Sequence, residues 1–187
     1  AVTDCDYIVG PTDMNATAAA EVKAWLDTAR TGYFIGKLVA ADYAADSMAV
    51  VNFSASSIVA GGTTYTGAGY CARIAGILAA TSIAASATYA PLEEVESVAA
   101  VADPDSAVDG GKLILLHDGR KAKIARAVNS LTTVPEGQSP ALKKIKVVEA
   151  IDLIRSYAIR LTEDRYVGRK SNSYDNKLAL VTELQEY

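Results

Sequence analysis

The chain has 187 residues, of which half are hydrophobic and 21% charged, and its formal net charge is −4. This composition is ordinary for a folded protein and leaves room for one large domain or two small ones. No apolar run reaches the roughly 18 residues of a membrane span, and the most apolar stretch, residues 68–85, contains Arg73. The first residues carry Asp4 and Asp6 without a basic segment, so neither a signal peptide nor a membrane partner is expected.

The charges are divided unevenly along the chain. Residues 1–111 carry four basic and thirteen acidic side chains, a net charge of −9, whereas residues 112–187 carry fourteen and nine, a net charge of +5. Such a division can mark a half that binds nucleic acid, or two surfaces that attract each other between copies of one protein. The basic residues lack interleaved aromatic side chains, so the second interpretation is favoured and no nucleic-acid partner is expected.

The first half of the chain predicts an α/β fold. A strand at residues 5–9 precedes a helix that runs to Arg30, carries Val22, Trp25, Leu26 and Ala29 on its inward face, and ends at Gly32. Strands follow at residues 33–40 and 50–53, and this order predicts a right-handed crossover between parallel strands. The fold expected for this part is a mixed sheet with flanking helices. Residues 57–60 form a short strand before the Gly61–Gly62 turn. A helix over residues 66–80 is then expected to pack closely through Gly69, Ala72, Gly76 and Ala80.

Residues 90–111 have the composition of a connection between domains. Two prolines, the acids Glu93, Glu94 and Glu96, and Gly110–Gly111 fall in this stretch. We therefore expect domains at residues 1–107 and 108–187, the second with α+β character.

The second half predicts a β-hairpin followed by a long helix. Strands at residues 112–117 and 120–128 flank Asp118–Gly119, a strong signal for a two-residue turn. Ser139 and Pro140 suit the start of a helix, in which Val147, Ile151, Ile154, Ala158 and Leu161 form an apolar stripe opposite Glu149, Asp152, Arg155 and Arg160. A last helix from Ser173 to Tyr187 has no capping signal at its end, so more sequence is expected to follow.

No pattern in the sequence indicates catalysis, a cofactor or a metal. Cys5 and Cys71 have no metal-binding or redox spacing and are expected to be buried, free thiols. His117 lies beside a turn and has no nucleophile motif to serve. The glycines near residue 61 lack the Lys-Ser or Lys-Thr ending of a phosphate loop. An α/β enzyme with hydrolytic activity is kept as the alternative class.

Four short motifs stand out in the second half of the chain. They are Ala-Val-Asn-Ser-Leu-Thr-Thr at residues 127–133, Lys-Ile-Lys-Val-Val at 144–148, Tyr-Val-Gly-Arg-Lys at 166–170 and Asn-Ser-Tyr-Asp-Asn-Lys at 172–177. In order and spacing they resemble the C-terminal domain of the tail sheath proteins of contractile phages and R-type bacteriocins. Residues 70–89 resemble the middle domain of the same family. The resemblance implies that residues 1–107 belong to a middle domain that is subtilisin-like in topology, and residues 108–187 to a C-terminal domain, both incomplete.

The resemblance also implies a function without catalysis. Sheath subunits form a helical array around an inner tail tube and contract to drive that tube through a target envelope. The implied partners are neighbouring subunits, linked by strand exchange, together with the inner tube protein and the baseplate and terminator proteins. The implied location is a virion tail or a tail-like particle that is assembled in the bacterial cytoplasm.

Two sets of residues are singled out on this basis. The first is expected to fix loop geometry and consists of Asn129, Ser130, Tyr166, Gly168, Asn172 and Asn176. The second contains candidates for contact with the inner tube, in two clusters: Lys143, Lys144 and Lys146 on the first turns of the long helix, and Arg165, Arg169, Lys170 and Lys177 after it. The second cluster is favoured, because it surrounds the break at Gly168.

Overall fold

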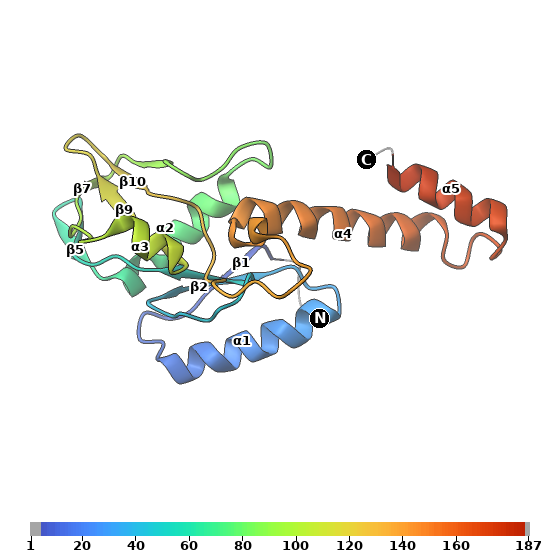
Figure 1. Ribbon diagram of the computed structural model, residues 1–187, viewed down its shortest axis with the longest axis horizontal. Coiled ribbons are helices and arrows are strands. Elements are labelled where there is room, and N and C mark those ends of the chain that lie inside the picture. Colours follow the sequence, from blue (N-terminus) through green and yellow to red (C-terminus); the bar gives the residue numbers. More distant parts are fainter. Residues whose placement is uncertain (1–4, 186–187) are drawn as a thin grey trace. The chain divides into compact units, whose positions relative to one another are not determined.

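The computed structural model of the protein describes residues 5–185 (Figure 1). The chain divides into two compact units, Ala1–Glu149 and Ala150–Tyr187. The division between these units falls inside the long helix, and the domain boundary near residue 107 stays a prediction. The expected end of the last helix at Tyr187 lies outside the described residues.

A parallel sheet lies at the centre of the first unit. Its strand order is β1 (Tyr7–Val9), β2 (Lys37–Ala41), β3 (Val50–Phe53) and β8 (Lys112–Leu113), and each neighbouring pair is parallel. The predicted strand–helix–strand crossover is confirmed by the parallel pairing of β1 with β2. The strand at residues 33–40 begins later than expected, at Lys37.

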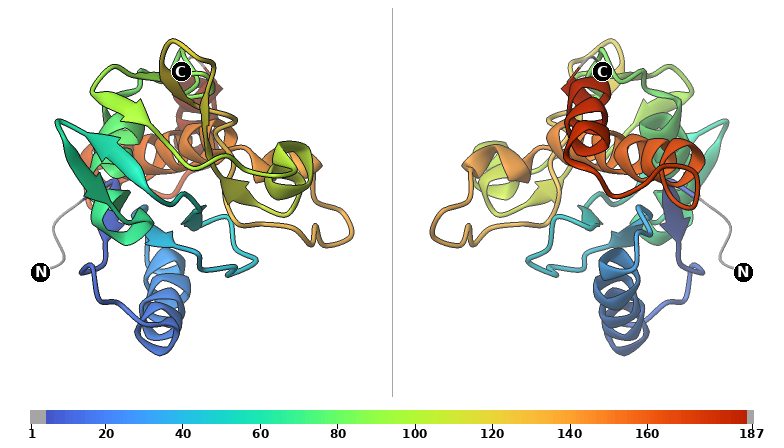
Figure 2. Two further views of the ribbon diagram at one scale, coloured as in Figure 1. Left: turned by 90° about the vertical axis from the view of Figure 1, so that its left-hand side faces the viewer. Right: turned by 90° about the vertical axis from the view of Figure 1, so that its right-hand side faces the viewer.

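Helices α1 (Ala16–Thr31) and α2 (Gly67–Ala80) cover opposite faces of this sheet (Figures 1 and 2). Successive residues of a strand point to opposite faces. Leu38 therefore packs in the cluster that contains Leu26 of α1, whereas Val39 packs in the cluster that contains Ile74 of α2. Trp25 was predicted on the inward stripe of α1, but it is 43% exposed and its ring rests against Phe34.

The close-packing prediction for α2 is wrong. The helix begins as expected at the cap Thr66, whose side chain accepts from the Gly69 N–H. Its buried face, however, consists of Tyr70, Cys71, Ile74, Ala75 and Leu78. Gly69, Ala72, Gly76 and Ala80 face outward. The apolar bulk of the larger side chains decided which face is buried.

Residues 90–111 are not a linker, because they contribute strands to two sheets. Strand β6 (Pro91–Leu92) pairs with β10, and β7 (Val95–Ser97) pairs with β4 (Ile58–Ala60), which also pairs with β5 (Thr63–Tyr65). A short helix, α3 (Pro104–Asp109), follows. Pro91 is tolerated because β6 is an edge strand.

The hairpin forms, but it is shorter than predicted. Strands β9 (Leu115–His117) and β10 (Ala122–Ile124) are antiparallel, and the loop spans Asp118–Lys121 instead of two residues. The Asp118 side chain accepts from the N–H groups of Arg120 and Lys121, which stabilises the longer loop. After Ile124 the chain leaves this sheet.

The long helix starts five residues later than predicted. Ser139 and Pro140 begin a short 3-10 helix, Pro140–Lys143, and α4 runs over Ile145–Arg165. The predicted stripe is wrong in its middle, because Ile151 and Ile154 are 48% and 58% exposed while Asp152 is buried. Helical spacing shows that a helix is amphipathic, but it does not show which face finds a packing partner.

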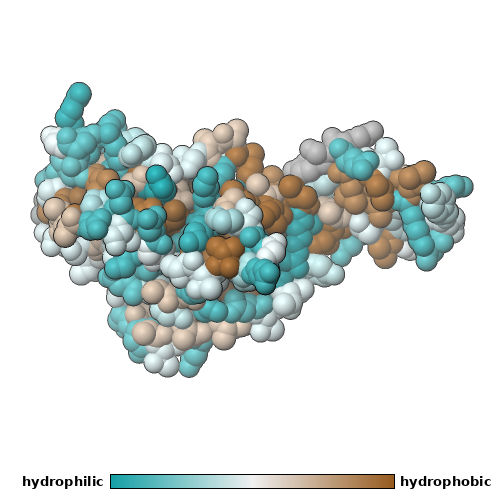
Figure 3. All heavy atoms as spheres, in the orientation of Figure 1, coloured by the Kyte–Doolittle hydropathy of each residue, from teal (hydrophilic) through white to brown (hydrophobic). Residues whose placement is uncertain are grey.

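In the second unit, α5 (Tyr174–Gln185) follows the turn after α4 and buries none of its described side chains. Apolar residues are therefore visible at the surface of this unit (Figure 3). Within residues 5–185, no helix is both long enough and apolar enough to cross a membrane.

Candidate functional site

Residues 127–133 form a connecting segment that ties two distant parts of the first unit together. Asn129 is 1% exposed, and its Nδ2 donates to the Leu142 carbonyl at 2.6 Å while its Oδ1 accepts from the Leu131 N–H at 3.1 Å. The Asn129 N–H donates to the Lys143 carbonyl, and the Ile145 N–H donates to the Ala127 carbonyl. The segment thereby holds the chain that enters α4.

The other side of the segment binds the turn between β2 and β3. The Ser130 hydroxyl donates to the Ser47 carbonyl at 2.9 Å and accepts from the Ser47 N–H at 3.2 Å. One oxygen of Asp46 accepts from the N–H groups of Thr132 and Thr133, at 2.7 and 2.9 Å. These N–H groups, that of Thr133 first, hold the pKa of the Asp46 carboxyl well below its ordinary value.

Gly111 makes this arrangement possible, although the sequence did not single it out. Its φ is +73°, and a Cβ placed on it would lie 2.9 Å from the Ser130 carbonyl oxygen. Only glycine combines a positive φ with so close a backbone approach. Asp46 was missed as well, because one acid in an irregular loop gives no spacing signal.

The first basic cluster divides into two environments. Lys143 and Lys144 line a pocket of about 450 Å³ together with Arg126 and Asn129. Lys146 points elsewhere, since its Nζ donates to the Ser82 carbonyl at 2.5 Å and lies 3.4 Å from a Glu149 oxygen.

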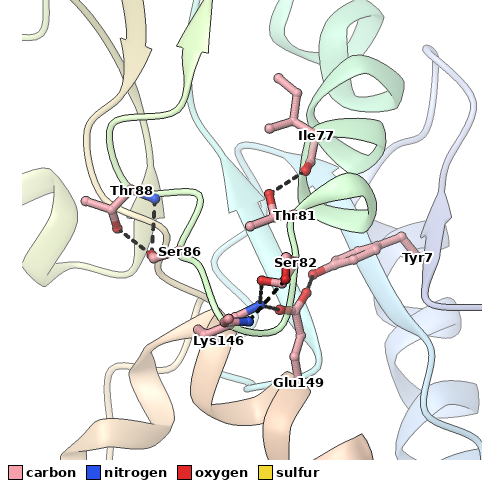
Figure 4. Close-up of polar contacts among 9 residues, drawn as sticks. Tyr7, Ile77, Thr81, Ser82, Ser86, Thr88, Lys146 and Glu149 are labelled. Atoms are coloured by element: carbon pink, nitrogen blue, oxygen red, sulfur yellow. Dashed lines mark hydrogen bonds and ion pairs between the residues drawn. The ribbon is translucent and has the colours of Figure 1, made fainter.

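Lys146 and Glu149 bind the first turn of α4 to other parts of the first unit. The Tyr7 hydroxyl donates to the other Glu149 oxygen at 2.5 Å, so β1, the chain after α2 and the start of α4 meet at one polar cluster (Figure 4). Lys146 is therefore engaged within the subunit and is a poorer candidate for contact with a tube than its two neighbours.

The second basic cluster lies in the second unit. Arg165 pairs with Glu183 at 3.4 Å, and the Lys170 ammonium lies 4.4 Å from the centre of the Tyr166 ring. Arg169 and Lys177 are exposed. Lys170 and Lys177 also line a pocket of about 230 Å³ at the turn between α4 and α5.

The remaining motif residues shape that turn. Gly168 has a φ of +70°, which permits the chain to reverse. Asn176 donates through Nδ2 to the Ser171 carbonyl at 2.9 Å. Tyr166 is buried, and Asn172 is exposed at the rim of the pocket. The predicted roles of these residues stay predictions.

His117, the glycines near residue 61 and the two cysteines are the residues that were considered for catalysis or ligand binding. His117 is exposed and its Nδ1 accepts from the Gly119 N–H, within the hairpin turn. Gly61 and Gly62 form the turn between β4 and β5. Burial raises the pKa of the Cys71 thiol to about 11, and Cys5 is half-buried. Within residues 5–185, no group of three or more His, Cys, Asp or Glu side chains is placed to hold a metal ion.

Comparisons with known proteins identify the class. No family model matches the chain. The fold matches the sheath tail protein of Desulfitobacterium hafniense with a TM-score of 0.90 at 22% identity, over all of this chain and 45% of that one. It also matches a chain of the contracted helical sheath of the anti-feeding prophage, with a TM-score of 0.65 at 14% identity, over 97% of this chain and 53% of that one. The fold is thus that of tail sheath proteins.

The sequence comparison is more specific. Over 153 residues, 81% of the chain, the sequence is 37% identical to the tail sheath protein of Clostridium phage phiCD119, and the match covers 43% of that relative. The chain is homologous to part of a tail sheath protein, and it spans less than half the length of this relative.

Proposed function

We propose that the chain belongs to a structural subunit of a contractile tail sheath, which polymerises as a helical array around an inner tube and contracts to drive the tube through a target envelope. The observation that carries the proposal is the agreement of the sequence match with a fold match over the whole chain. A head-to-tail interface that does not close on itself builds such a helix. Contraction then needs no nucleotide, because the extended array can store the free energy as a metastable packing.

The partners of this subunit follow from the proposed array. Copies of the same protein are the first partner, linked by exchanged strands, and the inner tube, baseplate and terminator proteins are the others. The particle is a virion tail or a tail-like particle, assembled in the bacterial cytoplasm. Residues 1–107 and 108–187 correspond in this proposal to parts of the middle and C-terminal sheath domains.

We assign the inner-tube contact to the second basic cluster. Arg169 and Lys177 are exposed, and no ion pair joins either to a carboxylate among residues 5–185. Polar contacts give register and orientation without a large desolvated surface, which suits a sheath that must slide along its tube.

Negative-stain microscopy tests the proposed function. The longest natural polypeptide that contains this chain is expressed with and without tube protein, and it is expected to form hollow, striated tubes. Reversal of Arg169 and Lys170 to Glu is expected to keep the subunit folded and to abolish assembly on tubes. Normal co-assembly of that double variant would move the tube contact elsewhere, and persistently monomeric protein would contradict the proposed function.

A further inference from the structure

One pocket of the first unit is lined by both basic and apolar side chains. Its volume is about 450 Å³, and its apolar lining residues are Val108, Val128, Leu131 and Pro140. Arg126, Lys143 and Lys144 supply three positive charges, against the single negative charge of Asp109. We call this feature the basic pocket.

None of the three cations of the basic pocket forms an ion pair within the described part of the subunit. Each ion pair found among residues 5–185 involves other side chains, and none of the three takes part in one. Arg126 and Lys144 are exposed, and Lys143 is half-buried. The basic pocket therefore carries an excess of positive charge that attracts an anionic group.

The backbone around the basic pocket is already bonded. The N–H groups of Gly111, Val128, Asn129 and Leu131 donate to Val108, Arg126, Lys143 and the Asn129 side chain, respectively. The pocket wall therefore offers no row of free donors to which a strand could be added. Recognition at this place depends on the side chains.

We propose that the basic pocket is a docking site for acidic side chains from residues 1–111 of a second copy of this chain. This inference rests on the proposed function, in which identical subunits lie side by side. Residues 1–111 carry a net charge of −9. Among them, Asp13, Glu21 and Asp105 are exposed and make no ion pair with a described residue. The aliphatic part of a Glu side chain also suits the apolar lining residues of the pocket.

The chemistry of the recognised group follows from the basic residues that line the pocket. Arg126 offers a planar guanidinium that fits a carboxylate with two parallel hydrogen bonds, and the lysines add point charges. A single exposed ion pair contributes little free energy to association, so this contact becomes strong only when it is repeated along an array.

A pair of charge-reversal variants with equal change in net charge tests the docking site. K143E/K144E removes two cations of the basic pocket. K112E/R120E reverses two exposed cations outside it and serves as the control. Self-association of the purified chain is measured at low salt by sedimentation velocity. Binding of hexaglutamate and of inorganic phosphate is measured by calorimetry.

The unaltered chain is expected to self-associate and to bind hexaglutamate more tightly than phosphate. K143E/K144E is expected to weaken both processes by about tenfold or more, and the control by less than about twofold. Because a double reversal could disturb folding, K143Q/K144Q is measured as well and is expected to show the same direction of loss with an unchanged unfolding midpoint.

Four results would overturn the inference. Equal losses in both reversal variants would show a generic charge effect. Tighter binding of phosphate than of hexaglutamate would show a phosphate site. Hexaglutamate binding by a chain that stays monomeric would exclude the second copy as the occupant. Normal tube formation by the full-length K143E/K144E variant would also contradict the proposed docking site, and it would leave the proposed function intact.

Discussion

At the scale of single residues, Asn129 shows how a polar side chain stabilises irregular backbone. It satisfies one carbonyl and one N–H of buried chain that belong to no ladder. Asn129→Ala is expected to lower the free energy of unfolding by about 2 kcal/mol, because the Leu142 carbonyl and the Leu131 N–H both lose their partner. Chemical denaturation measures this change.

Asn172→Ala is the matched control for that substitution. Asn172 is exposed, so its replacement is expected to change the free energy of unfolding by less than about 0.5 kcal/mol. If Asn129→Ala leaves stability unchanged but prevents assembly, Asn129 is an interface contact and its structural assignment is wrong.

Gly111 gives a second residue-scale prediction. Gly111→Ala places a Cβ 2.9 Å from the Ser130 carbonyl oxygen at a φ of +73°. The substitution is expected to cost about 2 kcal/mol of unfolding free energy through strain in this conformation. Gly76→Ala, on an exposed helical face where the added Cβ would meet no atom within 4 Å beyond the adjacent residues and backbone of its own helix, is expected to raise stability slightly. Thermal unfolding of both variants checks the opposite signs.

Glu94 links stability to pH. The Arg73 guanidinium lowers the pKa of the Glu94 carboxyl to about 2 from an ordinary value of 4.5, and the Tyr70 hydroxyl also donates to it. Because this pKa is lower in the folded state, the ionised Glu94 contributes its full free energy to folding above pH 4.5. This contribution is lost as the pH falls towards 2. The stability difference between the unaltered chain and Glu94→Gln should therefore shrink over this range. A difference that stays constant down to pH 2 would show that Glu94 ionisation is not involved.

The sequence singled out some residues of the connecting segment but not their partners. Asn129 and Ser130 were recognisable because Asn and Ser bind nearby backbone, and the family motif contains them. Asp46 and Gly111 lie roughly 20 to 80 residues away along the chain, and their roles depend on a tertiary approach that no local pattern encodes.

At the scale of elements, the capping residues predict where helices begin, but the sequence does not predict which face of a helix is buried. Asn15 and Thr66 cap α1 and α2 as their types suggest. Ser139 and Pro140 also mark a start, but of a 3-10 helix, because Lys144 returns to an extended conformation before α4. Residues 90–111 were misread since short edge strands tolerate the prolines and acids that also occur in linkers.

The start of α4 gives the element-scale prediction. Tyr7→Phe keeps the ring and removes the hydroxyl that binds Glu149. The free energy of unfolding is expected to fall by only about 1 kcal/mol, because Glu149 keeps Lys146 as a partner. Hydrogen exchange in the first turn of α4 is expected to become faster, because this turn loses its bond to Tyr7. Tyr174→Phe, at a side chain that is 78% exposed, is the control. Equal exchange rates in both variants would contradict the anchoring role of Tyr7.

At the scale of the whole molecule, the charge division has a consequence for assembly. Basic surface from residues 112–187 is expected to face acidic surface on a neighbouring copy, and added salt screens such attraction. Assembly of the full-length protein should therefore weaken as salt rises from low concentration to about 1 M, where the screening length falls to about 3 Å. Turbidity and sedimentation measure this dependence, and an assembly indifferent to salt would exclude an electrostatic contribution.

The most direct measurement for the central claim is electron cryo-microscopy of the full-length protein assembled with its tube. A helical sheath of repeated subunits around the tube is expected, with residues 165–177 facing the inner tube and Lys143 and Lys144 facing a neighbouring copy. A closed oligomer that never encloses a tube, or a particle in which residues 5–185 lie outside any repeating sheath, would contradict the account.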